Sequence, residues 1–171
     1  MNTRGISNAR LLLALVGVAI ALTIAGAVSF VRYTSRAAPD SHRVAVAPFD
    51  LFVSGLDPWR VQLARRVTDR IATQPGWTAV PQEVVAQRWK GQDRAEAAAV
   101  ELARRTQAGI AIYGRVDSVS VDSVRLHVLL VDVMSTMVKK TVELRTLRRD
   151  MELAADNLGA KIADELQSLA Q

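Results

Sequence analysis

The residue types that most often catalyse reactions or bind metals are sparse in this chain, and their spacing forms no known motif. The chain has two histidines and no cysteine. Neither His42, in a small polar segment, nor His127, in an alternating apolar segment, has a second histidine or a carboxylate at ligand spacing. The HExxH, CxxC and EF-hand patterns that mark zinc and calcium sites are absent from the sequence. We therefore expect no metal and no cofactor, and we interpret both histidines as structural or solvated.

The possible nucleophiles and acids of the sequence also form no catalytic motif. The sequence holds no GxSxG, no P-loop and no GxGxxG. Ser118, Ser120 and Ser123 surround a polar hairpin and have no evident base. Asp132 follows two apolar residues at the end of an expected strand, which is typical of a carboxylate that caps a turn. A pair of carboxylates that meet across a cleft is the remaining catalytic alternative. We predict no catalytic residue and a protein that is not an enzyme.

Tryptophan and arginine stand side by side at two places in the chain. Both residue types are enriched at the energetic centres of protein interfaces. We therefore predict Trp59, Arg60, Arg88 and Trp89 as candidate protein contacts, with ordinary core packing as the alternative for the two tryptophans. For the third tryptophan, Trp77, we favour the core.

Charge is distributed unevenly along the 171 residues. The whole chain has 22 basic and 17 acidic residues, a formal charge of +5. Four of the arginines and one aspartate precede His42, so the rest of the chain is nearly neutral. A nucleic-acid-binding domain usually shows a clustered basic face, and no such cluster is evident. We expect no nucleic-acid partner, and the length fits one domain plus a short appendage.

That appendage is an apolar run, Leu11–Val31, of 21 residues without a charge. As a helix it would be about 32 Å long, close to the roughly 30 Å hydrocarbon core of a bilayer. We predict a transmembrane helix at 11–31, with Arg10, Arg32 and Arg36 among lipid head groups. The alternative is a cleaved secretory signal ending near residues 25–27, although the run is longer than the 7–15 residues of such a signal.

The two flanks of the span do not fix its orientation by charge alone, because the positive-inside count nearly ties. Residues 1–10 form the N-terminal flank and residues 32–42 a tether. Gly17, Ala21 and Ala25 lie four apart on one helical face, a spacing that lets another transmembrane helix approach closely. We predict that these three residues pack against other integral membrane subunits; the alternative is that small residues are simply common in such helices.

The remaining residues, 43–171, are predicted to form one α+β domain. Asp57 and Pro58 are a helix-start signal, and hydrophobic periodicity assigns the other elements. The expected order is β-α-β-α-α-β-β-β-α, with one mixed sheet covered by helices. The expected strands are 42–49, 77–80, 109–121, 124–133 and 137–144, and the expected helices are 57–73, 81–89, 93–106 and 147–169.

Four segments in this order carry a resemblance to a known family. They are VAVAPF at 44–49, GWTAV at 76–80, GIAIYGRV at 109–116 and LVDV at 130–133. Together, over residues 43–168, the chain resembles the N-terminal domain of TolB. It resembles still more closely the TolB-like domains that follow a membrane helix in bacterial adenylate cyclases and serine/threonine kinases. Gly114 lies within a strand of this pattern, where glycine lets a bulky neighbour approach.

The chain also departs from this family. The helix after the first turn is rich in arginine, whereas family members usually have an acidic helix there. The chain has no room for the β-propeller of TolB and encodes no cyclase or kinase. The resemblance therefore implies a stand-alone, membrane-tethered domain of a type that binds other proteins.

These observations together predict a function and a location. We expect a non-catalytic accessory or scaffolding subunit that docks on a larger membrane protein complex, with respiratory and photosynthetic assemblies as candidate hosts. Its N-terminus would be cytoplasmic and its domain periplasmic, in the inner membrane of a bacterium. One alternative is an envelope sensor or transport component that binds a small ligand or a protein between sheet and helices. Another is a membrane-bound enzyme whose ligands come from distant segments.

Overall fold

A computed structural model describes residues 38–91 and 95–169. From Pro39 onward the chain forms a compact unit. No helix within the described ranges is long and apolar enough to cross a membrane. Several predictions fall outside these ranges and stay predictions: the span at 11–31, its packing residues Gly17, Ala21 and Ala25, and the lipid-flanking Arg10, Arg32 and Arg36.

The domain has the predicted α+β order, with one additional short strand and one 3-10 turn. The four helices are α2 (Trp59–Ala72), α3 (Gln82–Arg88), α4 (Ala95–Arg105) and α5 (Met151–Leu169), and a 3-10 turn, η1 (Arg148–Asp150), precedes α5. The strands are β1 (Asp40–Val46), β2 (Asp50–Phe52), β3 (Thr78–Ala79), β4 (Ala108–Ser118), β5 (Ser123–Asp132) and β6 (Val138–Leu147).

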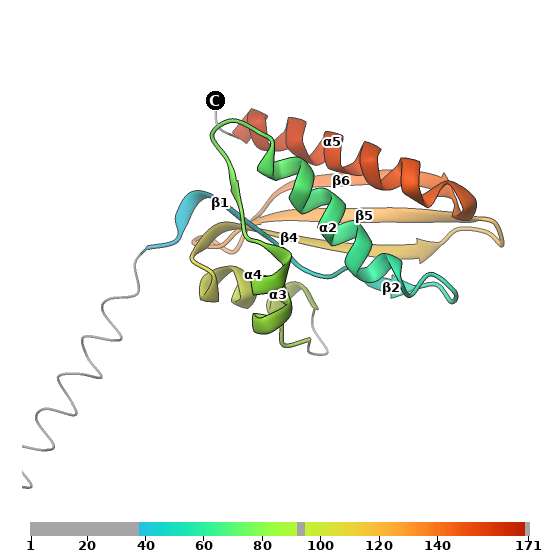
Figure 1. Cartoon of the computed structure of the whole chain (residues 1–171), viewed down its shortest axis with the longest axis horizontal. Helices are drawn as coiled ribbons and strands as arrows, with labels where there is room; N and C mark the ends of the chain where they lie inside the picture. Colours follow the sequence, from blue (N-terminus) through green and yellow to red (C-terminus); the bar gives the residue numbers. More distant parts are fainter. Residues whose placement is uncertain (1–37, 92–94, 170–171) are drawn as a thin grey trace, which may run out of the picture. The chain divides into compact units, whose positions relative to one another are not determined.

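All six strands belong to one mixed sheet in the order β3-β1-β4-β5-β6, and β2 pairs with the second half of β4 (Figure 1). β1 is parallel to both β3 and β4, and β2 is also parallel to β4. β4, β5 and β6 form an antiparallel meander. The mixed sheet predicted from the sequence is therefore confirmed.

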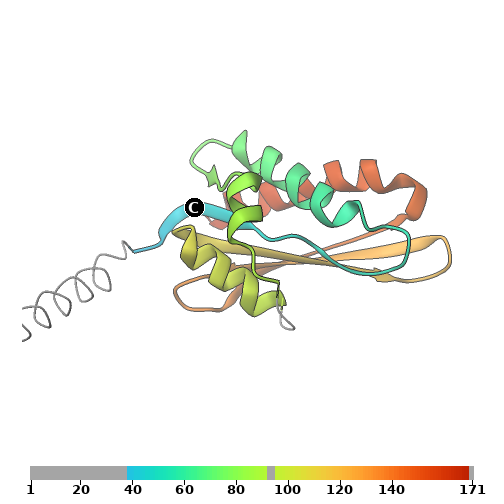
Figure 2. The same ribbon diagram turned by 60° about the horizontal axis from the view of Figure 1, so that its bottom comes forward.

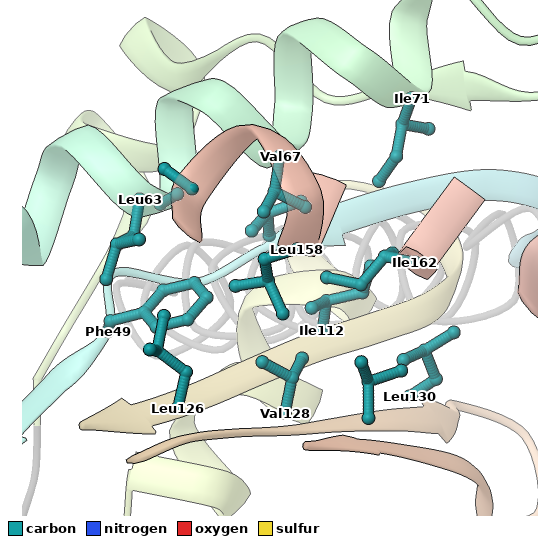
Figure 3. Close-up of a cluster of buried hydrophobic side chains, with 14 of the residues drawn as sticks. Phe49, Leu63, Val67, Ile71, Ile112, Leu126, Val128, Leu130, Leu158 and Ile162 are labelled. Atoms are coloured by element: carbon teal, nitrogen blue, oxygen red, sulfur yellow. The ribbon is translucent and has the colours of Figure 1, made fainter. Parts of the chain in front are cut away.

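The main core lies between one face of this sheet and the pair α2 and α5 (Figure 3). Alternate residues of β4 and β5 point into it, as the period of two in a strand requires. Arg66 of α2 holds the two helices together at the surface, with bonds of 2.9 Å to Asp156 and 2.8 Å to Glu152. The side chains that fill the core include Phe49, Leu63, Val67, Ile71, Ile112, Leu126, Val128, Leu130, Leu158 and Ile162.

A second core forms where α3 and α4 pack on the opposite face of the sheet. Small residues of the central strands, such as Ala45 and Ala111, allow the helices to approach closely. Gln82, at the start of α3, donates to the Val46 carbonyl at 3.2 Å and to Thr68 Oγ1 of α2 at 2.7 Å. Trp77 is 8% exposed and belongs to the main core, as predicted.

Three local expectations were wrong. Residues 119–121 do not extend β4: they form a loop in which Val121 is 84% exposed, because the chain already turns where Val119 N donates to the Ser123 carbonyl at 3.0 Å. The Asp57 side chain does not cap α2, which begins at Trp59 without a side-chain cap. Leu147 ends β6 instead of starting the last helix, because Arg148 N still donates to the Asp122 carbonyl at 2.8 Å.

Candidate functional site

Helices cover the two faces of the sheet unequally. α2 and α5 cover one face along its length, whereas α3 and α4 cover only part of the other (Figure 2). α4 packs on β4 and β1, and the far ends of β4, β5 and β6 lie beyond it. We call the uncovered part of this second face the open face. Strand register places on it the side chains of Phe52, Arg115, Asp117, Arg125, His127, Glu143, Arg145 and Leu147.

A groove of about 580 Å³ lies where the open face meets α4. Its apolar lining includes Val100 from α4 and Leu129 and Val131 from β5. The polar lining consists of Glu96 and Arg104 from α4, Tyr113 and Arg115 from β4, His127 from β5, and Thr136 from the β5–β6 turn. Pockets of this size and mixed character are typical of ligand or peptide sites.

Tyr113 is the most constrained polar group of the groove. Its hydroxyl donates to Asp50 Oδ2 at 3.0 Å, and Asp50 Oδ1 lies 3.6 Å from Arg60 Nη1 on α2. Burial of the ring and the hydrogen bond to the Asp50 carboxylate raise the pKa of Tyr113 to about 12. The phenol is therefore neutral at physiological pH and is already bonded, so it fixes the floor of the groove and is unsuited to act as a base.

His127 belongs to β5, the middle strand of the three that form most of the open face. Arg115 of β4 and Glu143 of β6 stand directly beside it in the two strand registers. Its Nε2 atom is 3.7 Å from Glu143 Oε1, so the pair becomes an ion pair only when the imidazole is protonated. One carboxylate and one imidazole are too few to hold a metal. Over the described ranges, no group of three histidine, aspartate or glutamate side chains is placed to bind one.

The carboxylates of the open face leave its arginines incompletely paired. Asp117 Oδ2 lies 3.2 Å from Arg115 Nε and 3.9 Å from Arg125 Nη2, so one carboxylate serves two guanidinium groups. Arg125 also stands directly opposite Arg145 in the β5–β6 register. Like charges that face each other across strands are unfavourable. No carboxylate of the described residues lies within ion-pair distance of Arg145, so this part of the face is suited to an incoming negative charge.

Apolar side chains border these arginines. Phe52 stands beside Asp117 in the β2–β4 register and is 65% exposed. Leu147 stands opposite Ser123 on the same face and is 38% exposed. An aromatic ring and a leucine next to arginines have the composition of a protein interface, in which such residues contribute most of the binding energy.

The four contact residues predicted from the sequence lie in two separate places. Trp59 and Arg60 begin α2, where Trp59 is half-buried against the main core. Trp89 follows α3 and is half-buried against the second core. Arg88 donates from Nη1 to the Arg105 carbonyl. The sheet separates the two cores, so the two pairs do not form one surface, and their role as contacts stays a prediction.

Sequence reasoning missed most of the groove and the open face. It placed His127 on the less apolar side of its strand, because the residues on either side of it are apolar. The same alternation in β5 could have identified Arg125 two residues earlier. Nothing local indicated that Tyr113 would reach Asp50, 63 positions away, or that β2 would form at all.

The Asp132 side chain has the predicted turn-capping role. Its Oδ1 atom accepts hydrogen bonds from the backbone N–H groups of Met134 and Ser135, both at 2.9 Å. The bond from the Ser135 N–H is the main reason that the pKa of Asp132 is lowered. The carboxylate therefore holds the β5–β6 turn, in which Thr136 adopts a positive φ of 55°.

Comparisons with known proteins find structures of similar fold but no family. No family model and no curated protein matches the chain. Among solved structures, a PelC dodecamer from Paraburkholderia phytofirmans matches with a TM-score of 0.50 at 16% identity, over 71% of this chain and 84% of that one. TolB from Acinetobacter baumannii matches at 0.48 and 16% identity, over 76% of this chain and only 28% of TolB. The C-terminal domain of LpoB from Salmonella enterica matches at 0.49 and 12% identity, over 64% of this chain and 85% of that one.

At such identities a structural likeness shows the fold alone. The resemblance to TolB-like domains stays a prediction from the sequence. What the chain binds must be argued from its own groove and open face.

Proposed function

We propose that this protein is a non-catalytic accessory subunit, anchored by residues 11–31, whose domain docks on a larger membrane protein complex through the open face. The observation that carries the proposal is the unequal cover of the sheet: α2 and α5 complete one face, whereas the other is left with arginines, an exposed phenylalanine and a groove. The absence of catalytic motifs in the sequence supports a binding role over an enzymatic one.

The chemistry of the open face describes the partner. Arg125 and Arg145 face each other, and Arg115 and Arg125 share Asp117. A partner carboxylate placed between Arg125 and Arg145 would replace a repulsion with two charge-assisted hydrogen bonds. Phe52, beside these arginines, would bury its ring under an apolar partner side chain. The expected partner segment therefore carries acidic and apolar residues together.

The proposed location rests on the predicted span and on the resemblance alone. A single span and a folded domain of this type favour a domain in the periplasm and an N-terminus in the cytoplasm of a bacterium. Trp59, Arg60, Arg88 and Trp89 remain predicted contacts, as second points of attachment at the ends of α2 and α3. Other integral membrane subunits would meet the anchor at Gly17, Ala21 and Ala25.

Site-specific photocrosslinking tests this proposal in the full-length chain in native membranes. A benzophenone amino acid replaces Phe52 on the open face, or Leu153 on α5 as the matched control, which is 64% exposed on the opposite side of the domain. We expect a discrete adduct with another membrane protein from position 52 and none from position 153. Adducts of equal yield from both positions, or from neither, would contradict docking through the open face.

A charge reversal then tests the chemistry. Arg125→Glu should reduce the yield of the adduct from position 52, because it removes the attraction for a partner carboxylate. Arg149→Glu, in the 3-10 turn before α5, changes the same charge at a side chain that is 80% exposed and is the control. An undiminished adduct in the Arg125→Glu variant would show that acidic partner groups do not bind there.

The groove itself favours one second candidate, a sensor or transport component that binds a small amphipathic anion. Apolar walls with Arg104 and Arg115 suit such a ligand. The fluorescent probe 1-anilinonaphthalene-8-sulfonate has this chemistry, and Val100→Trp would fill the groove. Probe binding that Val100→Trp abolishes would support this candidate; no binding, or binding that the substitution leaves unchanged, would dismiss it.

A further inference from the structure

The β5–β6 turn lies at the end of the sheet where β1 begins (Figure 2). On one side of β4, the Asp40 N–H at the start of β1 donates to the Gln107 carbonyl at 3.0 Å. On the other side, the Val133 N–H donates to the Gly109 carbonyl at 2.9 Å. Neighbouring strands lie about 4.8 Å apart, so Asp40 and Val133 are separated by only about 10 Å. We call this end of the sheet the tether end.

The turn at the tether end exposes large apolar side chains close together. Met134 is 70% exposed, Met137 65% and Val138 45%. The Asp132 carboxylate holds the backbone of the turn, and the Asp132 N–H also donates to the Met137 carbonyl at 2.9 Å. The two methionines are therefore presented on a fixed loop. Exposed apolar clusters of this kind mark contacts with proteins or with membranes.

The charges beside the turn are largely paired within the domain. Lys139 Nζ lies 3.7 Å from Asp132 Oδ2, and Lys140 Nζ lies 2.9 Å from Glu165 Oε2. Arg104, in the last turn of α4, lines the same groove as the β5–β6 turn. No carboxylate of the described residues lies within ion-pair distance of Arg104. The turn therefore offers an apolar contact, with one guanidinium nearby that can bond an anionic group such as a lipid phosphate.

The length of chain before β1 decides which partner is always within reach of this turn. The predicted span ends at Val31, so the eight residues 32–39 connect it to β1. Eight residues cover at most about 29 Å when fully extended. The bilayer that holds the predicted span would therefore lie within this distance of the tether end. A lipid surface accordingly fits the exposed methionines by chemistry and by position.

A second exposed apolar loop provides the comparison. Val119 and Val121, between β4 and β5, are 48% and 84% exposed. β4 is eleven residues long, so this loop lies about 36 Å from the tether end along the strand. The two loops are similar in exposure and differ in their distance from the point where the chain leaves the domain. Position thus favours the β5–β6 turn as the lipid contact.

We propose that the β5–β6 turn contacts the phospholipid surface of the membrane that holds the anchor, with the side chains of Met134 and Met137 inserted at the boundary of the acyl chains. The flexible methionine side chains adapt to such a surface, and burial of their apolar area drives the contact. The inference rests on the anchor of the proposed function and is independent of docking through the open face.

This contact would also orient the open face. Arg125 lies seven residues before Asp132 in β5, so it is about 23 Å from the turn along the strand. With the turn on the bilayer, the arginines of the open face would stand clear of the lipid. They would then be accessible to the folded part of a neighbouring membrane subunit.

Site-directed spin labelling tests the contact, since the chain has no cysteine of its own. The purified full-length chain is reconstituted without other proteins in vesicles of phosphatidylethanolamine and phosphatidylglycerol. It carries a nitroxide at Met134→Cys or, as the matched control, at Val121→Cys. Oxygen concentrates in lipid, whereas a charged nickel complex stays in water, so collisions with each reagent locate the label. We expect the ratio of oxygen to nickel collisions to be several-fold higher at position 134 than at position 121.

Three results would overturn the proposal. Nickel collisions as frequent at position 134 as at position 121 would place the turn in water. Few collisions with either reagent at position 134 would show that a second copy of the chain covers it. Lipid-like ratios at both positions would show that the label, and not the turn, drives insertion.

Flotation of the same vesicles separates this contact from the anchor. A chain that floats with the vesicles while its turn stays in water would refute the contact and leave the anchor intact. A chain that does not float would refute both. Neither result depends on a protein partner, so docking through the open face is tested apart from them.

A pair of charged substitutions tests the role of the methionines, with the label at Ser135→Cys. Met134→Glu together with Met137→Glu should return this label to water, because carboxylates are costly to bury in hydrocarbon. Nickel collisions should rise to the level of the label at position 121. Val119→Glu together with Val121→Glu adds the same charge at exposed positions of the other loop and should leave the label at 135 in lipid. A label that stays in lipid despite both methionine substitutions would contradict the proposal.

Discussion

The ring of Phe49 fills the space that a side chain at Gly114 would need. A Cβ atom at Gly114 would lie 2.5 Å from Phe49 Cδ1, and Phe49 itself is fully buried. One residue along each segment, on the other face of the sheet, Tyr113 donates its hydroxyl to Asp50. The two contacts lock the chain between β1 and β2 onto the middle of β4, from the main core on one side and from the groove on the other.

Gly114→Ala should therefore be destabilising, although alanine usually suits a strand better than glycine. Because the ring cannot move within the packed core, we expect the free energy of unfolding of the domain at 39–171 to fall by about 2–3 kcal/mol. Urea unfolding of this compact unit measures the change.

Urea unfolding also measures a control variant, Gly159→Ala, and the double variant that tests whether Gly114 and Phe49 compete for space. Gly159→Ala in α5 would bring its Cβ to 3.2 Å from Arg70 Cβ, and its helix position favours alanine by up to about 1 kcal/mol, so the net change should be small. Phe49→Ala alone should cost about 3–5 kcal/mol, and in that background Gly114→Ala should cost little more. Additive costs would show that the two residues do not compete for space.

Tyr113 should make the domain lose stability at high pH. Its pKa is raised to about 12 in the folded state by burial and by the hydrogen bond to Asp50, against about 10 in an unfolded chain. The stabilisation is therefore complete below about pH 10 and is lost as the pH rises toward 12. Tyr113 is the only tyrosine of residues 39–171, so tyrosinate absorbance reports this group alone.

Asp50→Asn should lower the pKa of Tyr113 toward its ordinary value, because the negative charge that opposes ionisation is removed. Tyr113→Phe should flatten the stability of the domain between pH 10 and 12. An Asp50→Asn variant that titrates like the parent domain would refute the role of the carboxylate.

Asp132 should stabilise the β5–β6 turn only when ionised. The Ser135 N–H that bonds its carboxylate lowers its pKa, so its contribution is present above the ordinary aspartate range and is lost as the pH falls through the lowered value. Asp132→Ala should reduce the free energy of unfolding at pH 7 by about 1 kcal/mol. Asp132→Asn keeps the acceptor oxygen and should lose less. Unfolding of the variants at pH 7 and pH 3 measures both effects, and equal losses at the two pH values would contradict them.

Arg60 and Arg88 should matter more for assembly than for stability. Arg60→Ala and Arg88→Ala remove side chains at the surface, so each should change the free energy of unfolding by less than about 1 kcal/mol. If the predicted contacts are real, each should lower the amount of partner protein recovered with the full-length chain from native membranes. Arg149→Ala is the matched control. Normal recovery with both variants would remove these residues from the interface.

The span at 11–31 should anchor the chain. We expect the full-length chain to remain in alkali-washed membranes and the domain at 39–171 to be released. Gly17→Leu and Ala21→Leu should weaken association with other membrane subunits, because they enlarge the predicted packing face. Protease added to intact spheroplasts should degrade the domain; protection there would reverse the predicted orientation.

The sequence alone determined the order of the elements and much of the local structure. Hydrophobic periodicity is a property of each segment by itself, so it correctly predicted the meander of β4, β5 and β6 and the apolar stripe of α5. Asp132 could be assigned to its turn because its partners lie two and three residues away. Gly114 could be recognised as a place of close approach, because a glycine within a strand has few other reasons to occur.

Only the tertiary structure decided where the candidate site lies. The alternation in β5 is enough to place His127 and Arg125 on one side of the strand, but no local pattern showed how far α4 would extend across that side. The unequal cover of the sheet depends on where helices dock, and docking depends on contacts between residues far apart in the chain, such as Tyr113 with Asp50 and Gly114 with Phe49. The free edge at β6 likewise follows from strand order, which periodicity does not encode. The segments therefore specified what each element would be, and their packing decided which surfaces were left for a partner.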